Sequence, residues 1–245
     1  MSPLSSSTCL ATLLLASLRP ALALSTPPRL LQRRSVLELG AAALTSAAGL
    51  RPHPASAVEE ETVKMYFGAG CFWHVQHEFV LKEAQALDRR GATFSAVSGY
   101  AGGRGTDRGR VCYHNMRSVA DYGELGHAEA VQVSLPRSAV PEFAEKFIGL
   151  FGERGFRHDP QDRGGEYRSV LGLPGGQASP LYPAIEKAAA GSPMKLVAGR
   201  GSEDDTLGSR EILVYDSDKY PFYPAELYHR IAAATRTLLF RPASD

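Results

Sequence analysis

The chain has 245 residues, of which 44% are hydrophobic, enough for one well-packed domain. Its formal net charge is +1, although residues 1–57 hold five arginines, no lysine and a single acid. The remaining residues therefore carry 22 basic and 25 acidic side chains, a net charge of −3. A protein that binds nucleic acid needs a basic face, and this balance predicts none.

Residues 1–57 are predicted to be a two-part targeting leader, followed by a single domain over 58–245. The first part is rich in Ser and Thr and contains an apolar run at 10–18. The second begins with Arg33-Arg34, continues as an alanine-rich apolar stretch and ends in Ala55-Ser56-Ala57, which resembles a twin-arginine export signal with its cleavage site. Both apolar runs are too short to span a membrane, so we expect no stable membrane insertion.

The order of these signals is typical of a plastid protein that is exported onward to the thylakoid lumen. The first apolar run also fits a secretory signal, as expected where a plastid is reached through the secretory route. The alternative destination is secretion from the cell.

Hydrophobic periodicity divides the rest of the chain into alternating strands and helices. The predicted strands are 63–69, 94–98, 128–135, 167–173, 194–198 and 211–215, and the predicted helices are 72–87, 140–152, 181–190 and 224–239. A turn is expected at 99–103 and a loop at 104–126. The order begins β-α-β-β-α-β, which predicts an α+β fold, a two-layer sandwich with a ferredoxin-like split βαβ core.

Cys71 stands between the first strand and the first helix and is followed at once by Phe72 and Trp73. A thiol at a helix N-terminus meets unpaired backbone N–H groups and the positive end of the helix dipole, which stabilise the thiolate. The two aromatic rings can form an apolar pocket for a soft sulfur substrate. The pattern therefore indicates a nucleophilic cysteine, although burial is the usual role of a single cysteine. The preceding Gly68-Ala69-Gly70 does not open a dinucleotide-binding fingerprint, since Trp73 occupies the position of its third glycine.

Three cysteines occur in the chain, and Cys9 belongs to the predicted leader. The other two, Cys71 and Cys112, are too few for a disulfide scaffold. A zinc site would use His127 as a ligand with Cys112 and His114 as companions, since these two residues have the Cys-x-His spacing. No second pair at metal-ligand spacing exists, so no metal site is predicted.

Several short segments together resemble the A-type peptide methionine sulfoxide reductases. In chain order they are Gly70-Cys71-Phe72-Trp73, Gly99-Tyr100-Ala101-Gly102-Gly103, Gly126-His127-Ala128-Glu129, His158-Asp159-Pro160, Tyr167-Arg168-Ser169 and Phe222-Tyr223-Pro224-Ala225-Glu226 with His229. The resemblance covers nearly all of residues 63–230. It implies thiol-dependent reduction of methionine (S)-S-oxide, in proteins and as the free amino acid, with no cofactor. It also implies a monomer that receives electrons from a thioredoxin-like or small-thiol reductant.

The resemblance also assigns roles to individual residues. The implied catalytic residues are Cys71, Glu129, Asp162 and Tyr167, and the implied substrate-binding residues are Phe72, Trp73 and Tyr122. Cys71 would attack the sulfoxide sulfur and become a sulfenic acid, while Glu129 would protonate the oxygen. A carboxyl beside aromatic rings should have a raised pKa, which suits it to donate a proton near neutral pH.

The chain departs from the family pattern at four places, one of which is a shortened segment between His158 and Asp162. The loop before Gly126 is longer than usual, so its substrate-contacting tyrosine is assigned to Tyr122, with Tyr113 as the alternative. Gln76 stands where the family commonly has Glu, and a structural role is expected for it. No cysteine follows Cys112, so either Cys112 resolves the sulfenic acid or an external thiol does, and the external thiol is favoured.

Two other functions remain open from the sequence. A non-catalytic module that binds oxidised methionine is one, and a thiol redox sensor or peroxidase is the other.

Overall fold

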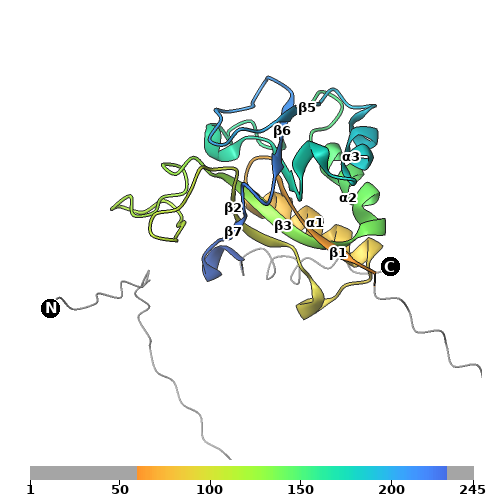
Figure 1. Ribbon diagram of the computed structural model, residues 1–245, viewed down its shortest axis with the longest axis horizontal. Coiled ribbons are helices and arrows are strands. Elements are labelled where there is room, and N and C mark those ends of the chain that lie inside the picture. Colours follow the sequence, from red (N-terminus) through yellow and green to blue (C-terminus); the bar gives the residue numbers. More distant parts are fainter. Residues whose placement is uncertain (1–59, 231–245) are drawn as a thin grey trace, which may run out of the picture. The chain divides into compact units, whose positions relative to one another are not determined.

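The computed structural model describes residues 60–230, and the predicted leader lies outside them (Figure 1). The strands are β1 (Thr62–Gly68), β2 (Val97–Ala101), β3 (Ala128–Pro136), β4 (Val170–Leu173), β5 (Lys195–Ala198), β6 (Glu211–Asp216) and β7 (Tyr223–Pro224). The helices are α1 (Phe72–Ala86), α2 (Val140–Gly149) and α3 (Tyr182–Ala189). No helix within residues 60–230 is long and apolar enough to cross a membrane.

All seven strands form one sheet in the order β5-β6-β4-β1-β3-β2-β7. The strands β4, β1, β3 and β2 pair with one another in antiparallel fashion, and β3 lies between β1 and β2, which α1 connects. This is the split βαβ core that the sequence predicts, and the α+β fold class is confirmed. β6 and β5 extend the sheet in parallel beyond β4, and β7 pairs with β2 at the opposite edge.

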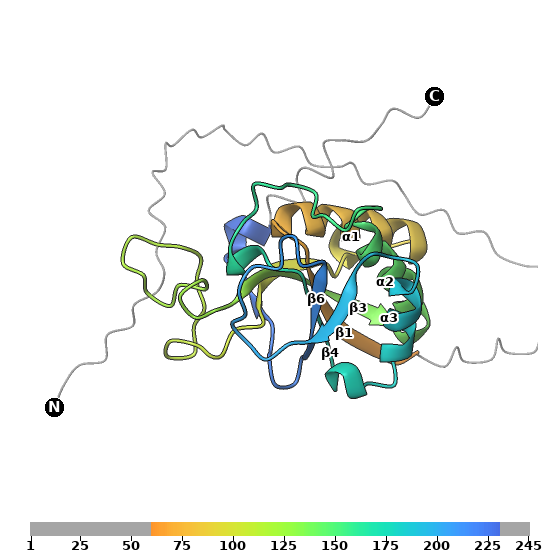
Figure 2. The same cartoon turned by 90° about the horizontal axis from the view of Figure 1, so that it is seen from above.

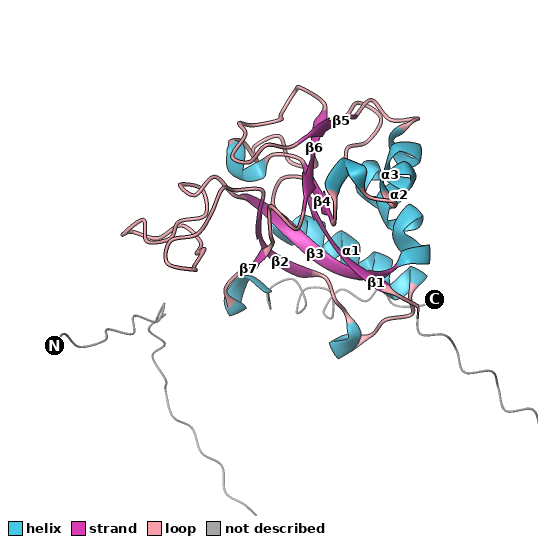
Figure 3. Cartoon of the chain, in the orientation of Figure 1, coloured by secondary structure: helices cyan, strands magenta, loops and turns pink. Residues whose placement is uncertain are grey.

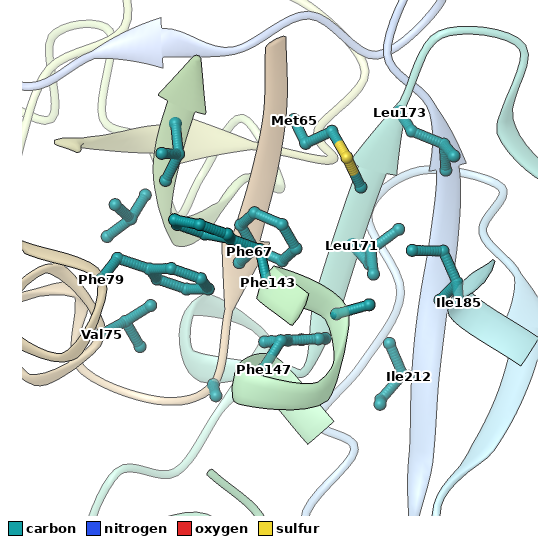
Figure 4. Close-up of a cluster of buried hydrophobic side chains, with 14 of the residues drawn as sticks. Met65, Phe67, Val75, Phe79, Phe143, Phe147, Leu171, Leu173, Ile185 and Ile212 are labelled. Carbon is teal, nitrogen blue, oxygen red and sulfur yellow. The ribbon is translucent and has the colours of Figure 1, made fainter. Parts of the chain in front are cut away.

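The three helices cover one face of the sheet (Figures 1 and 2). Because side chains alternate along a strand, Met65 and Phe67 of β1 point to the same face and contact this layer. Phe67 stacks on Phe79 of α1 with ring centroids 4.6 Å apart and lies 5.2 Å from Phe147 of α2 (Figure 4). This apolar layer holds the N-terminus of α1 against the end of β1.

The second strand begins three residues later than predicted, since β2 runs over Val97–Ala101 and the prediction was 94–98. The buried carboxylate of Glu83 accounts for the difference. It accepts the backbone N–H of Ser95 at 3.0 Å and the hydroxyl of Ser95 at 2.5 Å, which removes this residue from strand pairing. The glycine-rich segment consequently continues the strand, and the turn begins at Gly102.

Two further boundaries differ from the predictions (Figure 3). Tyr167 ends a short 3₁₀ turn, and β4 begins only at Val170. Pro224 pairs in β7, so the last helix begins at Leu227, and residues 231–239 of that prediction lie outside the described part of the chain.

Candidate active site

Cys71 is partly buried at the junction between β1 and α1. Its carbonyl accepts the N–H groups of His74 and Val75 at 3.2 and 3.4 Å, which begins the helix. The backbone reaches this point through Gly70, whose φ of +83° is in the left-handed region that favours glycine. The junction therefore presents the thiol at the N-terminus of α1, as the sequence predicts.

Glu129 is the second residue of β3, and only 1% of its surface is exposed. It lies on the same face of β3 as Val131 and Val133, so the carboxyl extends an apolar row toward the helix layer. Oε2 accepts the N–H of Phe72 at 2.8 Å, and Oε1 accepts the hydroxyl of Tyr122 at 3.4 Å. Burial raises the pKa of Glu129 to about 7, although both hydrogen bonds favour the ionised form.

Asp162 binds the nucleophile's own backbone. Its Oδ2 accepts the N–H of Cys71 at 2.8 Å, while the adjacent N–H of Phe72 is bound by Glu129. Two carboxylates thus satisfy consecutive N–H groups at the start of α1, where unpaired donors and the helix dipole favour negative charge. A Cβ on Gly70 would lie 2.6 Å from Oδ2 of Asp162, so glycine is required for this contact.

Tyr167 completes the predicted catalytic group. Its carbonyl accepts the N–H of Gly70 at 3.2 Å and is also bound by the guanidinium of Arg157. Burial raises the pKa of Tyr167, and the charges of Glu129 and Cys71 raise it further. The structure therefore brings together all four residues implied by the resemblance.

The thiol is less acidic than the sequence predicts. Burial, together with the nearby charge of Glu129, raises the pKa of Cys71 to about 11. The backbone N–H groups of Trp73 and His74 lower the pKa, as expected at a helix N-terminus, but burial and the carboxylates outweigh them. The two groups are coupled, because protonation of Glu129 removes the charge that opposes a thiolate at Cys71.

Aromatic rings surround Phe72, which is 2% exposed, and Trp73, which is partly buried. The ring of His229 lies 5.5 Å from Phe72 and 5.8 Å from Trp73, and its backbone carbonyl accepts the indole N–H at 3.2 Å. Nδ1 of His229 is buried and has no hydrogen-bond partner. The predicted pocket residues therefore form an aromatic wall beside the thiol, with the last helix closing one side.

Both candidate tyrosines lie at the site, at different depths. Tyr122 is fully buried and bonded to Glu129, whereas Tyr113 is partly exposed. The two rings stack at 5.6 Å. Burial raises the pKa of both tyrosines, and the negative charges at Glu129 and at Cys71 raise the pKa of Tyr113 further. Tyr122 thus donates a hydrogen bond to Glu129 from inside the protein, and Tyr113 is the tyrosine accessible to a substrate.

Two residues beyond those assigned from the sequence organise this wall. Glu226 accepts the hydroxyl of Tyr100 at 2.8 Å and the backbone N–H of Tyr113 at 2.8 Å, and so joins β2 to the long loop. His229 contacts the ring of Tyr113 at 4.3 Å. Both belong to the segment Phe222 to His229. They are three residues apart where the last helix begins, and this spacing predicts that they lie on the same face.

Cys112 precedes Tyr113 in the long loop and is 8% exposed. Its backbone pairs with the neighbouring segment, accepting the N–H of Tyr122 at 2.8 Å and donating to the carbonyl of Ala120 at 2.7 Å. Cys112 therefore lies on the buried side of the segment that carries Tyr113.

His127 serves a structural purpose. Its Nδ1 accepts the N–H of Gly103 at 3.0 Å, and its Nε2 donates to the carbonyl of Gly105 at 2.7 Å. Both ring nitrogens are thus used by the backbone. Among residues 60–230, no three His, Cys, Asp or Glu side chains are grouped so as to hold a metal ion.

Gln76 also has the structural role expected of it. The side chain is buried, donates to the carbonyl of Ala96 at 2.8 Å and accepts the hydroxyl of Ser98 at 2.7 Å. These contacts join α1 to β2 and do not reach the thiol.

The chain is similar to known proteins over most of this domain. The family model for peptide methionine sulfoxide reductase matches residues 63–191, just over half of the chain. A peptide methionine sulfoxide reductase MsrA of Escherichia fergusonii is 29% identical over 171 residues, covering 67% of this chain and 66% of that protein. One from Geobacter sulfurreducens is 33% identical over 115 residues, covering 44% of this chain and 59% of that protein.

The chain thus spans less than two thirds of the length of these two relatives. A solved structure of methionine sulfoxide reductase A of Corynebacterium diphtheriae aligns with a TM-score of 0.44 at 21% identity, covering 74% of this chain and 78% of that one. The family model covers β1 to α3 and includes Cys71, Glu129, Asp162 and Tyr167. On that match the chain belongs to the A-type peptide methionine sulfoxide reductase family.

Proposed function

We propose that this chain reduces the S epimer of methionine sulfoxide, in proteins and as the free amino acid, and so repairs oxidised methionine. The observation that carries the proposal is the position of Glu129. A carboxyl whose pKa is about 7 is bonded to the N–H of Phe72, the residue that follows the partly buried thiol of Cys71. An acid that holds its proton near neutral pH beside a nucleophilic sulfur is what sulfoxide reduction requires.

The reaction balances with thiols alone. Cys71 attacks the sulfoxide sulfur, Glu129 donates a proton to the oxygen, and the oxygen is transferred to Cys71 as a sulfenic acid while the methionine thioether leaves. Proton uptake by Glu129 also removes the charge that raises the pKa of Cys71, so the acid and the thiolate form together. Phe72 and Trp73 receive the substrate methyl group.

The activity is tested with free methionine sulfoxide and dithiothreitol. Cys71→Ser should abolish turnover, because serine cannot accept the oxygen. Glu129→Gln should slow the reduction step by about 10²–10⁴, the range for a positioned general acid. A Glu129→Gln rate equal to that of the wild type would move the proton donor elsewhere.

The other two functions fit the site less well. A binding module has no use for a protonated carboxyl beside a thiol, and a peroxidase has no use for the aromatic wall around Phe72. The same assay separates them, since binding without turnover would indicate a module and a preference for peroxide would indicate a peroxidase.

The sulfenic acid at Cys71 is proposed to be reduced by an external thiol, either a thioredoxin-like protein or a small thiol. The support is the burial of Cys112 and the backbone pairing that fixes its segment. Cys112→Ser should leave steady-state turnover with thioredoxin within about twofold of the wild type, because a direct reductant needs no second cysteine. A Cys112→Ser enzyme that turns over only once would instead make Cys112 the resolving thiol.

The protein is further proposed to act as a monomer in the thylakoid lumen of a plastid. The destination is supported by the order of signals in residues 1–57, with secretion as the alternative, and the monomer by the resemblance to the family.

A further inference from the structure

The three methionines within residues 60–230 differ sharply in exposure. Met65 is 1% exposed and Met194 is 6% exposed, and both belong to the apolar core. Met116 is 105% exposed, as open to solvent as in an unfolded peptide. A thioether is oxidised in proportion to its access to the oxidant, so Met116 is the methionine among these that peroxide reaches.

An ordered turn holds Met116 in this position. The side chain of Asn115 donates to the carbonyls of Tyr113 and Val119 at 3.1 and 3.0 Å and accepts the N–H groups of Arg117 and Val119 at 3.3 and 3.1 Å. These bonds close the turn beneath Met116. The turn belongs to the long loop between β2 and β3, which extends away from the sheet (Figures 1 and 2).

Residues on either side of Met116 leave its side chain open to a second protein molecule. Asn115, Arg117 and Ser118 are all exposed, so no bulky apolar neighbour covers the sulfur. Cys71 and Tyr113 are each only partly buried, so the site is open to the end of a methionine side chain from another molecule. A side chain as exposed as Met116 can enter that site on another copy without local unfolding.

We propose that Met116 is an oxidation site and that its S-sulfoxide is a substrate of Cys71 in a second copy of this chain, an inference that rests on the proposed function. The sulfur of Met116 attacks hydrogen peroxide, the O–O bond breaks, and water leaves, giving the sulfoxide. Cys71 of the other copy takes the oxygen as a sulfenic acid and restores the thioether. Two external thiols then become a disulfide, releasing water and regenerating Cys71.

The experiment uses full-length Cys71→Ser protein as the substrate, because it cannot repair itself. It is treated with hydrogen peroxide, freed of peroxide, and mixed with unoxidised wild-type protein at one hundredth of its concentration in dithiothreitol. Tryptic peptide 111–117 is followed by mass spectrometry, and its fragment ions separate oxidation of Met116 from oxidation of Cys112. We expect a 16-dalton gain at Met116, with Met65 and Met194 unchanged as internal controls.

About half of the Met116 sulfoxide should then disappear, because peroxide forms both epimers and the enzyme reduces only one. Met116→Leu should remove the signal and leave activity on free methionine sulfoxide unchanged. Resistance of Met116 to peroxide, or a full sulfoxide signal after incubation with wild-type protein that still reduces free methionine sulfoxide, would overturn the inference and leave the proposed function intact. Loss of both activities would count against the proposed function instead.

Discussion

At the scale of single residues, the burial of Glu129 has one consequence for catalysis and one for stability. Glu129 must be buried to keep its proton near neutral pH, and the same burial makes its ionised form costly. The ordinary pKa of 4.5 in the unfolded chain rises to about 7 in the folded protein. A folded-state pKa above the unfolded value stabilises the protein below about pH 4.5, and this contribution is lost as the pH rises through about 7.

Glu129→Gln should therefore stabilise the protein at alkaline pH while it impairs catalysis. The free energy of unfolding should rise by up to about 3 kcal/mol at pH 8 and change little at pH 4, since a shift of one pKa unit corresponds to about 1.4 kcal/mol. Urea unfolding at pH 4, 6 and 8 measures this difference. Glu145→Gln, which removes an exposed carboxylate from α2, is the matched control and should show no such pH dependence. If the free energy of unfolding changed with pH in the same way for both variants, the raised pKa of Glu129 would be contradicted.

The sequence predicts which residues meet at the candidate site, but their depth and acidity could not be predicted from it. The motif at Cys71 predicts a helix N-terminus, and this prediction is confirmed. The pKa of the thiol depends on burial and on Glu129, which is 58 positions away in the chain, so the local pattern gave the wrong direction. The choice between Tyr113 and Tyr122 likewise depends on how a long loop folds over the sheet, which short-range patterns do not determine.

At the scale of elements, the site is assembled at junctions. Cys71 lies between β1 and α1, Glu129 at the start of β3, and Asp162 in the loop before β4. The close approach of Asp162 to this junction depends on Gly70, because any larger residue would meet the carboxylate. Glycine is needed there for space as well as for its φ of +83°.

Gly70→Ala should lower kcat/KM by about tenfold or more, because displacing Asp162 removes a charge-assisted hydrogen bond from the backbone of Cys71. Gly208→Ala is the matched control, since Gly208 has a φ of +88° and open space around it. Both variants should lose about 1 kcal/mol or more of stability from the left-handed backbone. Equal kcat/KM values for the two variants would show that the Asp162 contact does not serve catalysis.

At the scale of the whole molecule, the β-α-β-β-α-β order was sufficient to predict the central sheet, because connection rules leave few arrangements for that pattern. The parallel pairing of β6 with β4 was beyond prediction from periodicity, since short apolar strands carry no information about their partners. Buried Glu83 also altered the start of β2 through a contact twelve residues away, which is tertiary structure overriding a local preference.

The proposed lumenal destination makes a separate prediction about residues 1–60. When they are fused to a fluorescent protein in a plant cell, the reporter should reach the thylakoid lumen with the leader removed near residue 58. Replacing Arg33-Arg34 by two lysines should hold it in the stroma, because the export machinery reads the paired arginines. Fluorescence in the growth medium would identify the chain as secreted. Fractionation followed by N-terminal sequencing distinguishes these outcomes.

The antiparallel ladder between β1 and β3 has a consequence for how the chain tolerates changes in length. Val131 pairs with Phe67, and Glu129 lies two residues further along the same face. A single-residue deletion between Glu129 and Val131 would turn the carboxyl toward the opposite side of the sheet, while most of the core would keep its packing. The site therefore depends more on the number of residues in this strand than on their identity. Such a shortened protein would fold, but the carboxyl of Glu129 would point away from the sulfur of Cys71.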